Sequence, residues 1–209
     1  MKKTTKNKIP KPAKHIYQFC ARLVGLEDKI WRRFEMSYGF SVAKLCYGIM
    51  LMFEMRGSHL YRIEYNGKNY GTCIDIDVFD TEELNATEYK LYELELKEND
   101  KLLFVYDFGD NWQVEITVEK IIYTEERLNG SNYPKLLEGA GEGIIEDIGG
   151  IGILQEFVEE NDKGNDVELP EVRWDGEHYK WNYKKFDFEW CKRKAKWIQD
   201  MVYRYEYED

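Results

Sequence analysis

Apolar and polar residues alternate along the first part of the chain, which predicts paired strands. In HIYQFCARL, residues 15–23, Tyr17, Phe19 and Ala21 share one side. The stretch IWRRFEM, residues 30–36, repeats the alternation after a break of glycine and acidic residues. A period of two places one side of a strand against a core. We therefore expect two adjacent antiparallel strands here.

The pattern then changes to that of a helix and returns to strands. A helix is predicted because apolar residues recur at intervals of three and four at Val42, Leu45, Cys46, Ile49 and Phe53. Ser41 stands where a helix N-cap is expected. In YRIEYNGKNYG, Asn66-Gly67 predicts a hairpin because both residues tolerate positive φ.

The middle of the chain predicts a meander of three antiparallel strands over residues 89–122. Leu94 and Leu96 precede the polar turn KEND, and a second turn is expected at residues 107–111. Val114, Ile116 and Val118 alternate after that turn. The acidic stretch DTEELNATEY, residues 80–89, predicts a helix before the meander.

The last third predicts loops and two helices. Residues 133–150 are rich in glycine and acid and are expected to form a loop, and so are residues 161–171. A short helix is predicted at 151–161, and an amphipathic helix at 186–203 has one face made of Phe188, Cys191, Ala195 and Ile198. The whole pattern predicts an α+β fold, a mostly antiparallel sheet with helices packed on one face.

Composition supports one domain at 15–209 after a basic tail. Residues 1–14 contain six lysines and no acid, which is typical of a disordered tail. The net charge of -10 argues against nucleic acid as a partner. No apolar run approaches the roughly 20 residues of a membrane span. The four cysteines form no CxxC pair, so we expect buried free thiols in a cytoplasmic protein.

Two acidic segments are the candidate sites. In YDFGDNW, residues 106–112, the carboxylates of Asp107 and Asp110 can hold the turn by accepting backbone N–H groups, the interpretation we favour. They can instead face a cleft, with Trp112 as a contact. In GAGEGIIEDIGG, residues 139–150, the candidates are Glu142, Glu146 and Asp147. Either these residues form a solvated loop, or they join the turn aspartates.

A cation is the ligand that such a joint site would take. Oxygen ligands suit Mg²⁺ or Ca²⁺, and the set would be Asp107, Asp110, Glu146 and Asp147. The spacing matches no established metal motif, so our first expectation is that no metal or other cofactor binds.

Basic residues add three further candidates. Arg32 and Arg33 must face opposite sides of their strand, and we expect one of them to pair with the acidic turns. The alternative is a guanidinium clamp for an anion. His59 is the one histidine inside a motif that resembles a known family, although an isolated histidine is more often a hydrogen-bonding residue than a ligand.

That family is identified by several segments in one order: IWRR, GSHLYRI, YDFGDNW, YPKLLEGAGEG and EDIGG. Over residues 15–190 the chain resembles the plasmid pRiA ORF-three-like family, also described as passenger proteins of insertion elements. The resemblance implies an α+β fold and leaves the activity open. The family usually has histidines where this chain has Tyr61 and Val114, which weakens the case for inherited metal chemistry.

Our leading hypothesis is a non-catalytic, cytoplasmic module of mobile elements that binds a protein. Its surface would be the hairpin at 107–112 and the loop at 138–150. The absence of a complete catalytic set supports this hypothesis. The alternative is a hydrolase or nuclease that uses a carboxylate-bound metal. The oligomeric state is left open.

Overall fold

The computed structural model describes residues 12–72, 83–124, 132–172 and 177–207, so most of the expected basic tail lies outside it. In chain order the elements are β1 (His15–Leu23), β2 (Trp31–Ser37), α1 (Val42–Met52), β3 (Tyr61–Tyr65), β4 (Lys68–Gly71), β5 (Glu83–Asn85), β6 (Lys101–Tyr106), β7 (Trp112–Tyr123), β8 (Lys135–Ala140), α2 (Ile151–Asp162), β9 (Val167–Val172), β10 (His178–Trp181), α3 (Phe188–Lys194) and α4 (Ile198–Glu206). Short 3₁₀ helices cover Leu91–Leu94, Tyr183–Lys185 and Ala195–Trp197.

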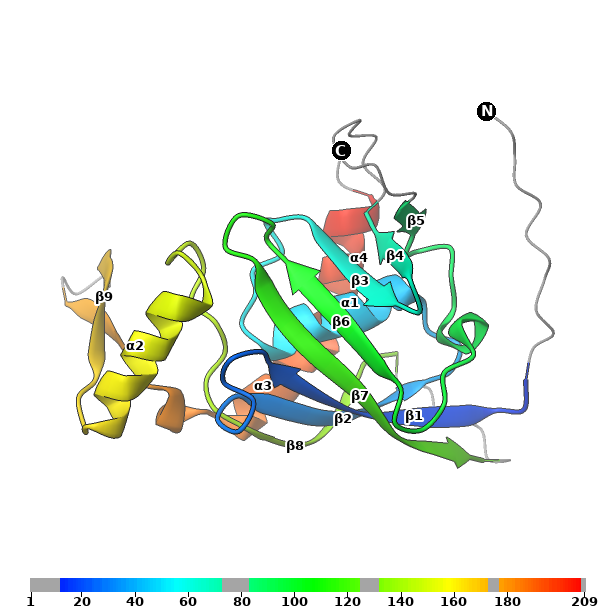
Figure 1. Ribbon diagram of the computed structural model, residues 1–209, viewed down its shortest axis with the longest axis horizontal. Coiled ribbons are helices and arrows are strands. Elements are labelled where there is room, and N and C mark those ends of the chain that lie inside the picture. The colour runs from blue at the N-terminus through cyan, green and yellow to red at the C-terminus, as the bar shows by residue number, and fades with distance from the viewer. Residues whose placement is uncertain (1–11, 73–82, 125–131, 173–176, 208–209) are drawn as a thin grey trace.

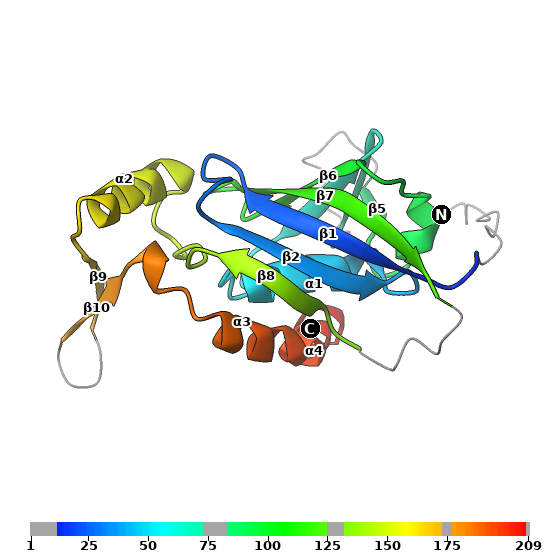
Figure 2. The same cartoon turned by 90° about the horizontal axis from the view of Figure 1, so that it is seen from below.

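An eight-stranded sheet is the body of the molecule and confirms the predicted α+β class. The strand order is β5-β4-β3-β6-β7-β1-β2-β8, and every neighbouring pair is antiparallel except β4 and β5. Helices α1, α3 and α4 cover one face of this sheet (Figures 1 and 2). Helix α2 and the separate β9–β10 pair stand at one end of it.

Helix α1 lies at the centre of the core. Nearly all of its residues are buried, because it is enclosed by the sheet on one side and by α3 and α4 on the other. The Ser41 side chain accepts the backbone N–H of Lys44, which confirms the predicted N-cap. The Asn66-Gly67 turn joins β3 to β4 as predicted, and Asn66 has a φ of 49°.

Two predicted elements in the middle of the chain are wrong. The helix expected at 80–89 is the strand β5 followed by a turn, with 80–82 outside the described residues. There the Asn85 side chain accepts the N–H of Thr87, and β5 pairs with the edge of β4. The strand expected around Leu94 is a 3₁₀ helix, since Glu93 accepts the N–H of Lys90 and bends the chain.

Two expected loops each contain a strand. Residues 135–140 form β8, which extends the sheet by pairing with β2, and β9 begins at Val167. The final helix is divided by the 3₁₀ turn at Ala195–Trp197, but Cys191, Ala195 and Ile198 are buried on one face as predicted. Cys20, Cys46 and Cys191 are buried free thiols, whereas Cys73 lies outside the described residues.

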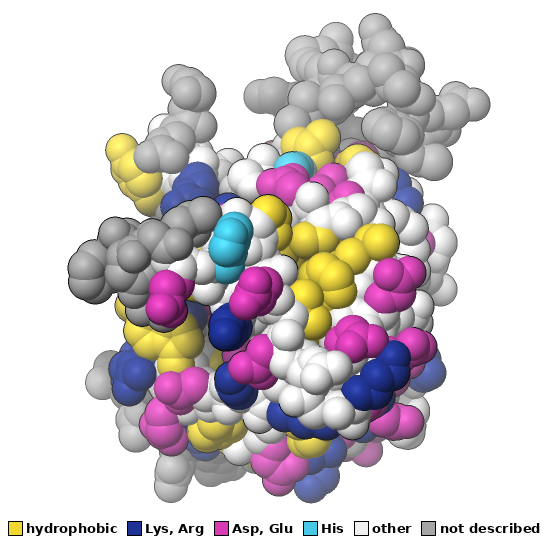
Figure 3. Space-filling view, turned by 90° about the vertical axis from the view of Figure 1, so that its left-hand side faces the viewer, with side chains coloured by type: hydrophobic (Ala, Val, Ile, Leu, Met, Phe, Trp, Pro, Cys, Tyr) yellow, Lys and Arg dark blue, Asp and Glu magenta, His cyan; other side chains and the backbone are white. Residues whose placement is uncertain are grey.

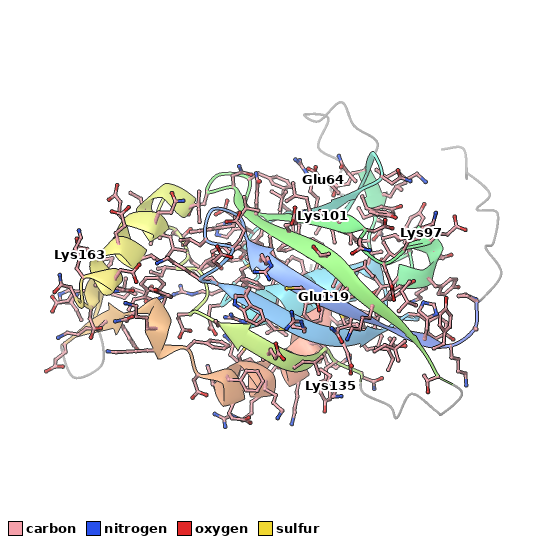
Figure 4. The ribbon with its side chains drawn as sticks, turned by 60° about the horizontal axis from the view of Figure 1, so that its bottom comes forward. Glu64, Lys97, Lys101, Glu119, Lys135 and Lys163 are labelled. Atoms are coloured by element: carbon pink, nitrogen blue, oxygen red, sulfur yellow. The ribbon has the colours of Figure 1, made fainter. Side chains whose placement is uncertain are left out.

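The surface agrees with the acidic composition. Figure 3 faces the end of the molecule that carries α2 and β9, where Lys and Arg side chains stand apart among Asp and Glu side chains. Lys163, near the end of α2, lies far from Glu119 and Lys135 on the sheet (Figure 4). Within the described residues, every helix is too short or too polar to cross a membrane.

Candidate metal centre

The ends of two neighbouring strands bring a histidine and an aspartate together. His59 lies two residues before β3, and Asp107 follows the last residue of β6. These strand ends are paired, because Tyr61 faces Tyr106 in the antiparallel register. The backbone N–H of Asp107 also donates to the carbonyl of Leu60 at 3.0 Å. The strand pairing therefore fixes both side chains at one corner of the sheet.

Two further carboxylates reach this corner from the loop between β8 and α2. His59 Nε2 lies 3.6 Å from Asp107 Oδ2, 3.4 Å from Glu146 Oε2 and 3.3 Å from Asp147 Oδ1. The ligand atoms of His59, Asp107 and Asp147 all lie within 4.8 Å of one another. In a tetrahedral site with bonds of about 2.1 Å, ligand atoms are about 3.4 Å apart. The spacing around Nε2 is close to that value.

Glu146 is held in place through one oxygen only. Its Oε1 accepts the backbone N–H of Arg56 at 2.6 Å and the hydroxyl of Tyr106 at 3.0 Å. Its Oε2 is buried and has no hydrogen-bond donor among the described residues, while the side chain as a whole is 2% exposed. A buried carboxylate oxygen without a donor costs free energy. A cation beside Oε2 would remove that cost.

The Tyr106 hydroxyl connects the two halves of the site. It accepts the backbone N–H groups of Gly57 and Ser58, at 3.1 and 3.2 Å, and donates to Glu146. Burial, followed by the neighbouring Glu146 carboxylate, raises the pKa of Tyr106 to about 12. The hydroxyl therefore stays protonated and remains a donor at neutral pH. This contact fixes the segment that leads into His59.

Two of the candidate ligands adopt left-handed backbone conformations, with φ of 54° at Asp107 and 59° at Asp147. Such residues carry a backbone cost, and they are common at functional sites. Asp107 Oδ1 accepts the N–H of Gly109 at 2.9 Å, so this carboxylate both holds the turn and presents Oδ2 to His59. Asp110 accepts the N–H of Gly149 at 3.1 Å and so fastens the loop to the hairpin.

The remaining candidates lie outside this cluster. Arg32 is fully buried and donates to the carbonyls of Trp31, Met52, Ala140 and Gly141. Arg33 pairs with Glu119 and Glu138 instead of the acidic turns. Glu119 lies on the sheet face turned away from the helices (Figure 4). Trp112 is fully buried and offers no surface to a partner.

Glu142 belongs to a separate cavity near the C-terminal helices. Burial, and next the neighbouring Glu54 carboxylate, raises the pKa of Glu142 above its ordinary value of 4.5. A carboxyl group with a raised pKa binds its proton more tightly in the folded state. Its ionised form therefore lowers stability above the folded-state pKa, and the penalty fades as pH falls towards the unfolded pKa.

Replacing Glu142 with glutamine should consequently raise the midpoint of thermal unfolding, and more at about pH 8 than at about pH 4. Differential scanning calorimetry at both pH values measures this difference. Glu138→Gln on β8 is the control, since Glu138 is paired with Arg33. Equal shifts at the two pH values would contradict a raised pKa at Glu142.

Sequence reasoning proposed four carboxylates for a cation, and the structure groups three of them around His59. Asp107, Glu146 and Asp147 converge, while Asp110 is used by the loop backbone. Tyr106 was not among the predicted site residues. Its position at the end of a predicted strand, directly before Asp107, is the signal that could have indicated its role. Tyr61 and Val114, the positions at which the family resemblance implies histidine, are buried in the core.

Comparison with known proteins shows similarity over most of the chain. The family model described as "Plasmid pRiA4b ORF-3-like protein" matches residues 15–195. A crystal structure of a protein of unknown function from Methanosarcina mazei Go1 has a TM-score of 0.61 and 24% identity, over 88% of this chain and 98% of that one. At that identity the likeness shows the fold alone. Among curated proteins, none matches this chain.

Proposed function

This chain belongs to the plasmid pRiA4b ORF-3-like family, whose function is unknown, and we propose that it binds a divalent transition-metal ion. The ligands are His59, Asp107 and Asp147, with Glu146 beside them. The observation that supports the proposal most is the buried Oε2 of Glu146, which faces the His59 imidazole and lacks a hydrogen-bond donor among the described residues.

The ligand types select the class of metal. Mg²⁺ and Ca²⁺ prefer oxygen ligands alone, whereas one imidazole nitrogen with carboxylate oxygens suits Zn²⁺, Mn²⁺ or Fe²⁺. The separations of 3.3 to 3.6 Å around His59 Nε2 are compatible with a tetrahedral Zn²⁺ site. The ligand set therefore favours a transition-metal ion over the Mg²⁺ or Ca²⁺ that the carboxylates alone suggested.

Hydrolysis is the chemistry that this arrangement supports. A divalent ion held by His59, Asp107 and Asp147 would supply a bound water of lowered pKa for attack on an acyl or phosphoryl centre. Glu146, which lies beside these ligands, would be the carboxylate that accepts the water proton and returns it to the leaving group. We therefore propose a metal-dependent hydrolase.

Metal binding by the purified protein tests this proposal. The protein, freed of metal by chelation, is titrated with Zn²⁺ and with Mn²⁺ in a calorimeter. One ion should bind per chain, and His59→Gln should weaken binding at least tenfold, because the nitrogen ligand of the proposed set is lost. His178→Gln is the matched control, since His178 bonds to the Leu169 carbonyl and lies outside the cluster.

Two results would refute a metal site at His59. One is wild-type protein that takes up neither ion. The other is a His59→Gln variant that binds as tightly as the His178→Gln variant. Hydrolytic activity is measured only on protein that passes this test, with acyl and phosphoryl esters as model substrates.

A protein-binding role is the second candidate, and exposed aromatic residues favour it. Trp190 and Trp197 are 39% and 46% exposed, and their rings meet edge to face at 5.3 Å on the C-terminal helices. Paired exposed tryptophans are common in protein interfaces. This surface differs from the hairpin expected above, in which Trp112 is buried. An association with mobile elements and a cytoplasmic location are parts of the same proposal.

A further inference from the structure

A cavity of about 520 Å³ lies beside the candidate metal centre and is distinct from it. Its walls come from the end of α1, from β9 and β10, and from α3 and α4. Glu146 lies at the boundary between the two, but His59, Asp107 and Asp147 are not part of the cavity wall. The volume is that of a small-molecule or side-chain site.

Most cationic side chains of the cavity lie beside carboxylates. Lys194 pairs with Glu54, and Arg56 lies 3.0 Å from Glu171. Lys185 pairs with Asp166 at 2.7 Å, and Lys180 lies 3.7 Å from Glu168. Arg204 instead donates to the backbone carbonyl of Arg56.

Glu142 is a carboxylate of the wall that these pairs leave over. It is half-buried in the cavity wall and has no ion pair among the described residues. Burial and the charge of Glu54 raise its pKa, because together they outweigh the attraction of the nearby Arg32 and Lys194 charges. A further positive group that entered the cavity would therefore stabilise the ionised form of Glu142.

The rest of the wall suits an apolar stem that carries such a group. Trp181 lines the cavity, is 7% exposed, and its indole N–H has no acceptor among the described residues. Leu51, Ile144 and Met201 add apolar surface. Carboxylates bind ammonium and guanidinium groups through charge-assisted hydrogen bonds, and aromatic rings favour both cations.

We propose that this cavity binds an organic cation, an ammonium or guanidinium group on an apolar stem, with Glu142 as its counter-ion. The ligand is either a free amine or the side chain of a lysine or arginine in a polypeptide. The proposed metal ligands His59, Asp107 and Asp147 lie outside the cavity wall, and Glu146 is the residue that the cavity shares with the metal centre.

Calorimetric titration with two probes tests the proposal. Agmatine represents a free guanidinium, and acetyl-Gly-Arg-Gly-amide represents the same group in a peptide. Wild-type protein should bind at least one of the two, and the tighter probe identifies the source. N-butylurea, which is uncharged, should bind at least tenfold more weakly than agmatine or not at all.

Variants at two glutamates decide the role of Glu142. Glu142→Gln should weaken binding at least tenfold, since the charge-assisted bond is lost. Glu189→Gln on the exposed side of α3 should bind as the wild type does. Thermal unfolding followed by circular dichroism checks that the Glu142→Gln variant is folded. Its unfolding midpoint is expected to rise. Absence of binding by both probes, or equal affinity of the Glu142→Gln and Glu189→Gln variants, would overturn the proposal.

Discussion

Replacing Arg32 with methionine should lower the free energy of unfolding by about 3 to 5 kcal/mol, because it leaves several buried carbonyls without a donor. Arg32 is fully buried and binds four backbone carbonyls from three segments of the chain. Its guanidinium also stacks on Phe186, 4.0 Å from the ring centre. Methionine fills similar volume but donates no hydrogen bond. Urea unfolding followed by circular dichroism measures the loss.

The neighbouring arginine provides the control for that measurement. Arg33 stands on the opposite side of β2 and is partly exposed, with Glu119 and Glu138 as its partners. Arg33→Met should cost about 1 kcal/mol or less, as is usual for pairs in contact with water. If both variants lost the same amount, the carbonyl cluster around Arg32 would not be the source of stability that we describe.

Zinc at one hundred times its dissociation constant should stabilise the protein by about 2.7 kcal/mol, because it binds the folded state alone. The double variant Asp107→Asn/Asp147→Asn should lose this gain, since it keeps the shape of the site but lacks two anionic ligands. Thermal unfolding with and without the ion gives the difference for each protein.

The control for the metal effect removes the same charge elsewhere. Glu156 and Glu159 are exposed on α2, so Glu156→Gln/Glu159→Gln changes the net charge by the same amount away from the site. This variant should retain the full stabilisation by zinc. A gain that persisted in the aspartate variant, or that vanished in the α2 variant, would show that the ion acts elsewhere.

The parts of the fold that local sequence determines could be predicted. Ser41 caps α1, Asn66-Gly67 turns the β3–β4 hairpin, and β6 and β7 follow their alternating residues. The strands β5 and β8 could not, because each lies at an edge of the sheet. Their strand conformation depends on pairing with β4 and β2, which no local pattern encodes.

The candidate site also has a part that the sequence indicates and a part that depends on tertiary contacts. Residue type placed Asp107, Glu146 and Asp147 among the candidates, and the family resemblance added His59. Their convergence depends on the pairing of Tyr61 with Tyr106 and on the attachment of the β8–α2 loop to the hairpin through Asp110. Both are tertiary contacts. Arg32 and Trp112 were also candidates because of their residue type. Both are fully buried, and their contacts stabilise the fold.

The hydrogen bond between Tyr106 and Glu146 joins residues that lie 40 positions apart in the sequence. A bound ion would join the same two parts of the chain. One ligand group, His59 and Asp107, stands at the paired ends of β3 and β6, and the other, Asp147, lies in the segment that leads into α2. An ion held by both groups would be a reversible cross-link between these two parts of the chain. Its removal would loosen the attachment of that segment and leave the sheet intact.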